Sequence, residues 1–280
     1  GHDGGATFSM GNQVTMSGGG ELDNGMTVSI SYQLDHKAGV TGPFDDHSVT
    51  ISSDAMGALT LHGHGAGSAT SSMDATAAGN VWDTFDTSIG LATGVTHTNS
   101  APTNNALSYV MPTIMDGVAV NLSYKPQSSG NSIDSGVGYA VTYTGVEGLT
   151  LVYSMSDIVG TTSALSGEQT AWKASYAYGP VTATVTQSEY DVTTTTSDQD
   201  VSSMAVSYTV SDEMSVTYGT ETIESTSSGH VDAEYDVIKG SYTSGGMTVS
   251  AQRKTADNID HSTNANADLE YWGLGLAFAF

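Results

Sequence analysis

Cysteine is absent from this sequence, which excludes disulfides, thiolate chemistry and zinc-ribbon sites. No apolar run reaches the roughly 18 residues that a membrane-spanning helix needs. Apolar residues make up only 38% of the 280 residues, below the share usual in soluble globular domains. A soluble fold of this length buries a large core, and this sequence has little to fill one. A barrel with its apolar side chains outside and water inside removes that requirement.

Positive charge is scarce as well. Six Lys and Arg residues stand against 30 Asp and Glu residues, which gives a net charge of −24. This balance argues against nucleic-acid binding, because phosphate contacts need clustered cations, and against binding to anionic lipid surfaces. It fits either a pore that attracts cations or a protein of a high-salt environment, where screening relieves self-repulsion. Composition does not separate these two interpretations.

Catalytic motifs are also missing. Serines and carboxylates are numerous, but the sequence contains no nucleophile elbow, phosphate-cradling loop or metalloprotease helix. We therefore predict that the protein is not an enzyme.

The sequence does contain apolar–polar alternation along almost its whole length, the pattern of β-strands. Segment 26–34 alternates apolar residues with small polar ones, and the C-terminal segment does the same from about residue 269. Its apolar positions are Leu274, Leu276, Phe278 and Phe280. Alternation and turn signals together give about fifteen strands. The predicted fold class is all-β, an antiparallel transmembrane β-barrel that forms a single domain over 1–280.

Two kinds of connection alternate between the strands. Short turns such as Asp23-Asn24-Gly25 lie at one end, where Asn-Gly readily adopts the positive φ of a tight hairpin. Longer polar loops lie at the other end, at 36–46, 126–135, 157–168, 191–200, 224–229 and 255–268. Short turns on one side and long loops on the other are the asymmetry of an outer-membrane barrel.

One connection, 65–105, is far longer than the rest, and a loop of that length usually has a function. It is rich in Gly, Ala, Ser and Thr and carries Asp74, Asp83 and Asp86. We predict that these acids form a constriction that selects cations, with His62 and His64 on the strand before it. The alternative is that the acids only solvate a loop.

Several segments, taken in order, resemble the general porins of Gram-negative bacteria, most closely those of marine alphaproteobacteria. The resemblance spans nearly the whole chain. The segments that carry it are Glu21-Leu22-Asp23-Asn24-Gly25-Met26-Thr27-Val28, Met56-Gly57-Ala58-Leu59-Thr60-Leu61, Gly79-Asn80-Val81-Trp82-Asp83-Thr84, Asn105-Ala106-Leu107-Ser108-Tyr109, Met115-Asp116-Gly117-Val118-Ala119-Val120 and Leu276-Ala277-Phe278-Ala279-Phe280.

The resemblance implies a trimeric channel of about sixteen strands in the outer membrane of a Gram-negative bacterium. Its long third loop, here 65–105, folds into the lumen and narrows the pore. The C-terminal residues Phe278 and Phe280 correspond to the family's barrel-assembly signal. The implied partners are the lipid bilayer, small hydrophilic solutes, ions and two further copies of the chain. No cofactor is implied.

The direction of the first strand indicates that another strand precedes it. With both termini on the short-turn side the strand number is even, yet the first visible strand, about 6–22, descends toward that side. Residues 1–5 are too few for an ascending strand and have no signal-peptide features. We expect that the N-terminal segment folds differently or that the chain as given lacks its first strand, and that any signal peptide has been removed.

The charges depart from the usual pattern of the family, in which Arg and Lys on the wall face carboxylates on the loop. Arg253 is the sole arginine, so we expect a weak transverse field and a preference for cations. Lys173, Lys239 and Lys254 are candidate lumen cations on the later strands, although the alternation around Lys239 is ambiguous.

Metal binding is a secondary hypothesis. His62 and His64 have metal-ligand spacing, but two histidines do not make a site unless Asp74 or another loop acid completes it, so we interpret them as lumen-wall groups. Three acidic segments of the outer loops either bind Ca²⁺ weakly or are only solvated. These segments are Asp45-Asp46-His47, Asp198-Gln199-Asp200 and Asp257-Asn258-Ile259-Asp260.

The favoured function is passive diffusion of small hydrophilic solutes through a cation-preferring pore. The alternative is a secreted or surface β-rich protein, an adhesin or layer component, whose acidic loops bind calcium. In that case the apolar stripes would face each other across a sandwich.

Overall fold

The computed structural model describes residues 13–34, 44–65, 68–73, 75–85, 104–126, 133–161, 166–193, 198–225, 228–263 and 267–278. Within them, regular structure is β-strand apart from three short 3-10 turns, η1 (Ala69–Met73), η2 (Val81–Thr84) and η4 (Ile259–His261). None of the helical turns in this part of the chain is long and apolar enough to cross a membrane.

Fifteen strands form one sheet in which every strand pairs antiparallel with its neighbours in sequence, the simplest order that short hairpins allow. The strands are β1 (Val14–Glu21), β2 (Thr27–Leu34), β3 (Phe44–Ser53), β4 (Gly57–His64), β5 (Ala106–Val110), β6 (Val118–Lys125), β7 (Ile133–Tyr143), β8 (Leu149–Gly160), β9 (Gly167–Tyr178), β10 (Val181–Val192), β11 (Gln199–Ser211), β12 (Met214–Ser225), β13 (Ala233–Ser244), β14 (Met247–Asp257) and β15 (Leu269–Phe278).

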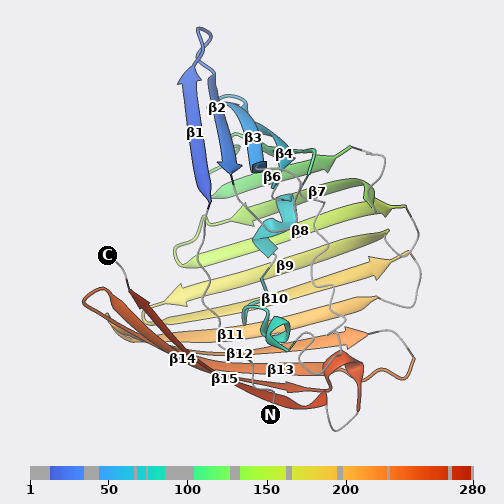
Figure 1. Cartoon of the computed structure of the whole chain (residues 1–280), viewed down its shortest axis with the longest axis vertical. Coiled ribbons are helices and arrows are strands. Elements are labelled where there is room, and N and C mark those ends of the chain that lie inside the picture. The colour runs from blue at the N-terminus through green and yellow to red at the C-terminus, as the bar shows by residue number, and fades with distance from the viewer. Residues whose placement is uncertain are drawn as a thin grey trace.

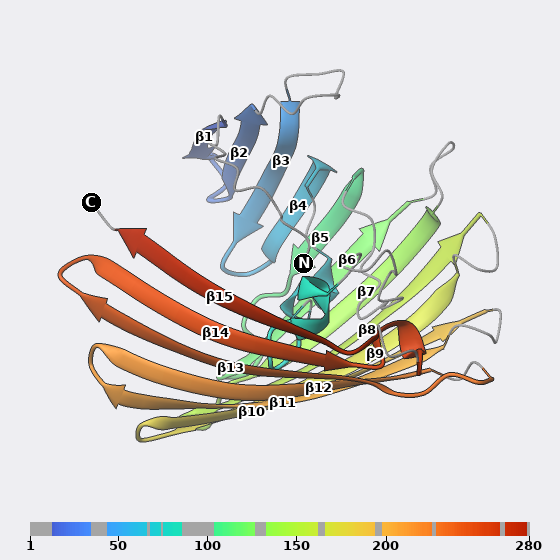
Figure 2. The same ribbon diagram turned by 60° about the horizontal axis from the view of Figure 1, so that its bottom comes forward.

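The sheet curves into a trough, and η1 and η2 lie on its concave side (Figure 1, Figure 2). The strand bounds confirm the predicted asymmetry: short turns join β1 to β2, β3 to β4 and every later odd–even pair, while the longer connections lie at the opposite end. We call these the short-turn end and the long-loop end. β1 and β15 are the two edges of the sheet (Figure 2), each with one partner strand among the described residues.

The two faces of the sheet differ as the alternation predicts. Large apolar side chains stand exposed on the convex face, among them Leu274 at 84%, Leu61 at 55% and Val137 at 53% exposure. Exposed apolar area on this scale indicates contact with hydrocarbon rather than water.

The concave face carries hydroxyl groups instead. Directly opposed Ser and Thr residues approach to 2.8 Å across neighbouring strands, which satisfies hydroxyl groups without an apolar core. The pairs are Thr50 with Thr60, Ser175 with Thr184, Ser207 with Thr217, and Ser215 with Ser241.

The sequence placed the loop boundaries incorrectly in several places. β8 continues to Gly160 and β9 begins at Gly167, so half of the predicted loop 157–168 is strand, and β10 and β11 likewise extend into 191–200. The reason is that ladder hydrogen bonds need no apolar side chains, so pairing continues where alternation of apolar residues stops. The expectation that the N-terminal segment folds differently or that a preceding strand is lacking concerns residues outside the described part of the chain, which begins at residue 13.

Candidate functional site

The segment from Ser68 to Phe85 crosses the concave face of the sheet. Its first turn, η1, contacts β6 to β9, and its second turn, η2, contacts β12 and β13. Figure 1 shows both turns in front of the middle of the sheet rather than beyond its edge. We call this part of the chain the inward segment. It lies within the predicted constriction loop 65–105 and narrows the space that the trough encloses.

Hydroxyl groups of the wall hold the inward segment in place. The backbone amides of Ala77 and Ala78 donate to Thr186 Oγ1 of β10 and Ser203 Oγ of β11, both at 3.0 Å. A buried amide without an acceptor costs about 1–3 kcal/mol, so these contacts decide where the segment lies. Because the acceptors come from adjacent strands, the segment follows the wall rather than bridging free space.

Glu221 of β12 is the strongest single anchor. Its side chain is only 1% exposed, and it accepts hydrogen bonds from Thr76 Oγ1 and, at 3.2 Å, from the backbone amide of Trp82. A carboxylate buried to this degree is stable only when donors surround it. Glu221 therefore links the two halves of the inward segment to one strand.

A compact turn lies between these halves. Asn80 adopts a left-handed conformation with φ 53°, which Asn tolerates better than most residues. Its side chain accepts from the Thr76 amide at 2.9 Å, and Thr76 Oγ1 accepts from the Asn80 amide at 2.8 Å. These two reciprocal hydrogen bonds between Thr76 and Asn80 fix the shape of the inward segment where the segment contacts Glu221.

One glycine of the wall makes room for the segment. A Cβ on Gly219 of β12 would lie 2.8 Å from the Ala78 Cβ. Glycine at this position allows closer approach of another backbone than any other residue.

A dry cluster lies under η2. Val81 and Phe85 are buried against inward-facing residues of β11 to β14, with the Phe85 and Tyr235 rings 6.1 Å apart. The wall residues of this cluster are Val201, Ile223, Ala233, Tyr235, Val237 and Ala256. The inner face is therefore apolar where η2 covers it, which explains why the alternation in β13 was ambiguous: Val237 faces inward and Ile238 outward.

Asp83 and two of the predicted lumen lysines lie near one another at the inward segment. Asp83 is exposed on η2, and Lys254 Nζ donates to Thr84 Oγ1 next to it. Lys254 also interacts electrostatically with Glu221, Asp83 and Lys239. The ladder places Lys239 opposite Gln252, on the same inner face as Lys254.

The remaining lumen-facing cations lie elsewhere on the wall. Lys173 of β9 pairs with Thr186, the residue that anchors Ala77, and so faces inward. Lys125 of β6 is on the same face as Ser123, which lies 3.5 Å from Ser68, and it is only 2% exposed. Together with Lys239 and Lys254, four lysines face the lumen among the described residues.

Most strand carboxylates point the other way. The cross-strand pairs Asp157–Glu168, Glu189–Asp200 and Glu234–Asp257 lie on the outer face near the long-loop end. Most short turns also carry a carboxylate, namely Asp23, Asp54, Asp116, Glu147, Asp212 and Glu213. In the described part of the chain, the acid excess thus lies at the two ends of the sheet rather than on its inner wall.

Arg253 faces outward. It pairs in the ladder with Trp272, forms an ion pair of 3.0 Å with Glu270, and its guanidinium lies 5.8 Å from the centre of the Trp272 ring. This arginine belongs to the outer face and does not contribute to a lumen field.

The two histidines of β4 have different partners. His62 Nε2 lies 2.8 Å from Ser108 Oγ of β5, whereas His64 Nδ1 lies 2.9 Å from Asp46 Oδ1 of β3. The pairing register between β3 and β4 also shifts between His47 and Ser48, beside these two histidines. Asp45 and Asp46 are also part of β3, not of an outer loop.

Two other predicted groups are only partly described. Phe278 ends β15 on the outer face, 56% exposed, in pairing with Met247. Asp74, Asp86 and Phe280 lie outside the described residues.

The sequence interpretation missed Glu221 and Lys125. Both follow from strand parity: Met214, Val216 and Tyr218 face outward, so Glu221 must face inward. Its anchoring role had no signal in the sequence, because its partners in the inward segment are 145 and 139 residues away.

Comparison with known proteins agrees with this architecture. The profile of the Gram-negative porin family matches residues 1–236. The fold is similar to an anion-selective porin from Comamonas acidovorans (TM-score 0.63, 14% identity, covering 98% of this chain and 87% of that one). It is also similar to OmpF of Salmonella typhi in complex with daunomycin (TM-score 0.65, 14% identity, 95% and 89% covered).

A loop-deletion mutant of OmpT from Vibrio cholerae gives a TM-score of 0.62 at 14% identity, with 95% of this chain and 89% of that one covered. At these identities the likenesses concern the fold alone. No curated protein matches the chain.

Proposed function

This chain belongs to the Gram-negative porin family, and on that basis we propose that it passes small hydrophilic solutes by passive diffusion with a preference for cations. The family places it in the outer membrane of a Gram-negative bacterium, as a channel and not an enzyme. The match does not support the alternative of a secreted or surface adhesin.

Passive, size-limited diffusion is supported by one observation above all: the inward segment is anchored to the wall through Glu221, Thr186 and Ser203. A segment held by buried hydrogen bonds narrows the lumen by a constant amount. The hydroxyl-lined wall offers water and polar solutes hydrogen bonds without a strong site for any one of them. The size of a solute therefore mainly determines whether it passes through the channel.

The cation preference rests on the carboxylates at the two ends of the channel and on the net charge of −24. Fixed charges at a pore entrance raise the local concentration of counter-ions. The lumen lysines oppose this effect at the constriction, where Asp83 offsets part of their charge. We therefore expect a weak cation preference that fades as salt rises, since the Debye length falls from about 10 Å at 0.1 M to about 3 Å at 1 M.

The test is the reversal potential of single channels in a planar bilayer under a KCl gradient, at mean concentrations near 0.1 M and 1 M. A potential of the cation-selective sign that shrinks at high salt supports the proposal. A potential of the anion-selective sign at low salt refutes it.

Assembly and calcium binding are further parts of the proposal. We expect a homotrimer, as the family resemblance implies. Cross-linking in detergent tests this expectation, with a band expected at three times the chain mass of 28.8 kDa.

Weak Ca²⁺ binding at acidic segments such as Asp198-Gln199-Asp200 remains a prediction, which equilibrium dialysis with ⁴⁵Ca²⁺ tests.

A further inference from the structure

The pairing register shifts at two places near the start of β3, at the long-loop end. β2 and β3 shift between Tyr32 and Leu34, and β3 and β4 shift between His47 and Ser48. Consecutive side chains of a regular strand point to opposite faces of the sheet, but a bulge changes the direction in which the side chains beside it point. Asp45 and Asp46 lie in the first irregular stretch and are therefore free to point the same way.

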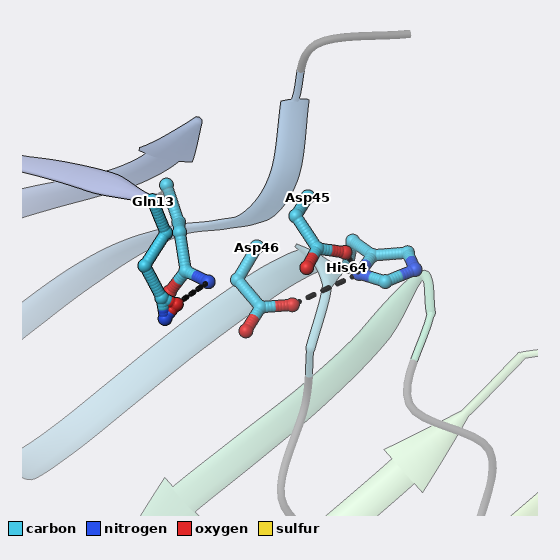
Figure 3. Close-up of polar contacts among 5 residues, drawn as sticks. Gln13, Asp45, Asp46 and His64 are labelled. Carbon is cyan, nitrogen blue, oxygen red and sulfur yellow. Dashed lines mark hydrogen bonds and ion pairs between the residues drawn. The ribbon is translucent and has the colours of Figure 1, made fainter. Parts of the chain in front are cut away.

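Both carboxylates converge on one imidazole nitrogen. His64 Nδ1 of β4 lies 2.9 Å from Asp46 Oδ1 and 3.5 Å from Asp45 Oδ1. Figure 3 shows the side chains of Asp45 and Asp46 pointing toward the His64 ring. The side chains of His64, Asp45 and Asp46 are 41%, 40% and 49% exposed, so an ion in solution has access to all three.

At two positions around the cluster, a side chain in place of glycine would displace a neighbouring side chain. A Cβ on Gly63 would lie 1.9 Å from His47 Nε2, and one on Gly65 would lie 2.1 Å from Asp46 Oδ1. Gly65 also has φ +71°, which L side chains rarely adopt. The two glycines that flank His64 thus leave room for the side chains of His47 and Asp46.

We propose that Asp45, Asp46 and His64 bind one divalent transition-metal ion at the long-loop end of the channel. One ligand atom from each residue lies within 4.8 Å of the other two. Ligand atoms about 2.1 Å from a tetrahedral Zn²⁺ are about 3.4 Å apart. The 3.5 Å between His64 Nδ1 and Asp45 Oδ1 already fits this value. The 2.9 Å between His64 Nδ1 and Asp46 Oδ1 would increase slightly when the ion binds. One imidazole with two carboxylates suits Zn²⁺ and its neighbours, whereas Ca²⁺ takes oxygen ligands. Water completes the coordination.

A neighbouring nitrogen supports the proposal. His47, which pairs with His64 in the ladder, has a buried Nδ1 with no hydrogen-bond partner among the described residues. In native structures such an atom is accounted for by strain, by a redox or catalytic role, or by an ordered water or ion. The cluster lies on β3 and β4, whereas η1 and η2 make their main contacts with β6 to β9 and with β12 and β13.

Isothermal titration calorimetry of the full chain in detergent tests the site, with ZnCl₂ as the probe. We expect one saturable Zn²⁺ per chain, and affinity at least about tenfold weaker in His64→Ala and in the nearly isosteric Asp46→Asn. His62→Ala is the matched control, because His62 bonds Ser108 and lies outside the cluster. An equal concentration of Ca²⁺ should not displace Zn²⁺.

The proposal is overturned if the parent protein shows no saturable Zn²⁺ binding, if both cluster variants bind as the parent does, or if His62→Ala weakens binding as much as His64→Ala. Heat-dependent gel mobility reports the fold of each variant, and Asp46→Asn decides the question if His64→Ala does not fold. Binding is measured without a membrane, so the result does not depend on the proposed conduction.

Discussion

Thr76 donates its hydroxyl hydrogen to Glu221 across 145 positions of the chain, from the inward segment to the buried side of β12. The same carboxylate accepts from the Trp82 amide. One side chain of the wall therefore holds both halves of the segment that narrows the lumen.

Glu221→Ala should release this contact. Thr76 and the Trp82 amide lose their acceptor in a buried place, which costs about 1–3 kcal/mol of stability. We expect a lower midpoint of the heat-induced mobility change on gels and larger current fluctuations in single channels. Glu224→Ala, three residues along the same strand but exposed, is the control and should stay within about 0.5 kcal/mol of the parent. Equal behaviour of the two variants would show that Glu221 is not an anchor.

Phe85→Ala tests the dry cluster under η2. Phe85 is 2% exposed and packs against Tyr235, so truncation should cost about 3–5 kcal/mol in denaturant unfolding from lipid vesicles. Ile238→Ala removes a side chain from the outer face, where lipid refills the space, and should cost clearly less. The reverse order of these two losses would contradict the assignment of inner and outer faces in β13.

Lys254→Gln and Arg253→Gln separate the two faces electrostatically. The residues are adjacent in β14, yet Lys254 reaches Thr84 in the lumen and Arg253 binds Glu270 outside. Loss of the lumen charge should move the reversal potential toward stronger cation selectivity, and loss of the outer charge should leave it unchanged. A shift of similar size in both variants would rule out the proposed lumen position of Lys254.

Gly219→Ala probes the close approach of the inward segment to the wall. The new Cβ would lie 2.8 Å from the Ala78 Cβ, so the segment must move into the lumen or the fold must absorb about 1–3 kcal/mol. We expect lower single-channel conductance. Gly20→Ala, with no atom within 4 Å of its Cβ, is the control. Conductance equal to the parent would place the segment farther from β12 than described.

The sequence predicted the sheet and its orientation because both depend on a local period of two. Leu274 and Leu61 are exposed on the outer face as that period requires. The same period of two is the basis on which Lys173 was named a candidate lumen cation. It did not predict which residues cover the wall. Glu221 and Tyr235 contact residues of the inward segment about 150 positions away, and alternation carries no information on such contacts. The Asp45–Asp46–His64 cluster was missed because bulges break the period itself.

The proposed channel needs an aqueous inner face and a lipid-facing outer face, and substituted-cysteine labelling measures this most directly. The chain has no cysteine, so Asp83→Cys and Leu274→Cys each introduce a single thiol. In a planar bilayer, a charged, membrane-impermeant thiol reagent should change the conductance of Asp83→Cys within each open channel and leave Leu274→Cys unmodified. Rapid modification of Leu274→Cys with protection of Asp83→Cys would contradict the account.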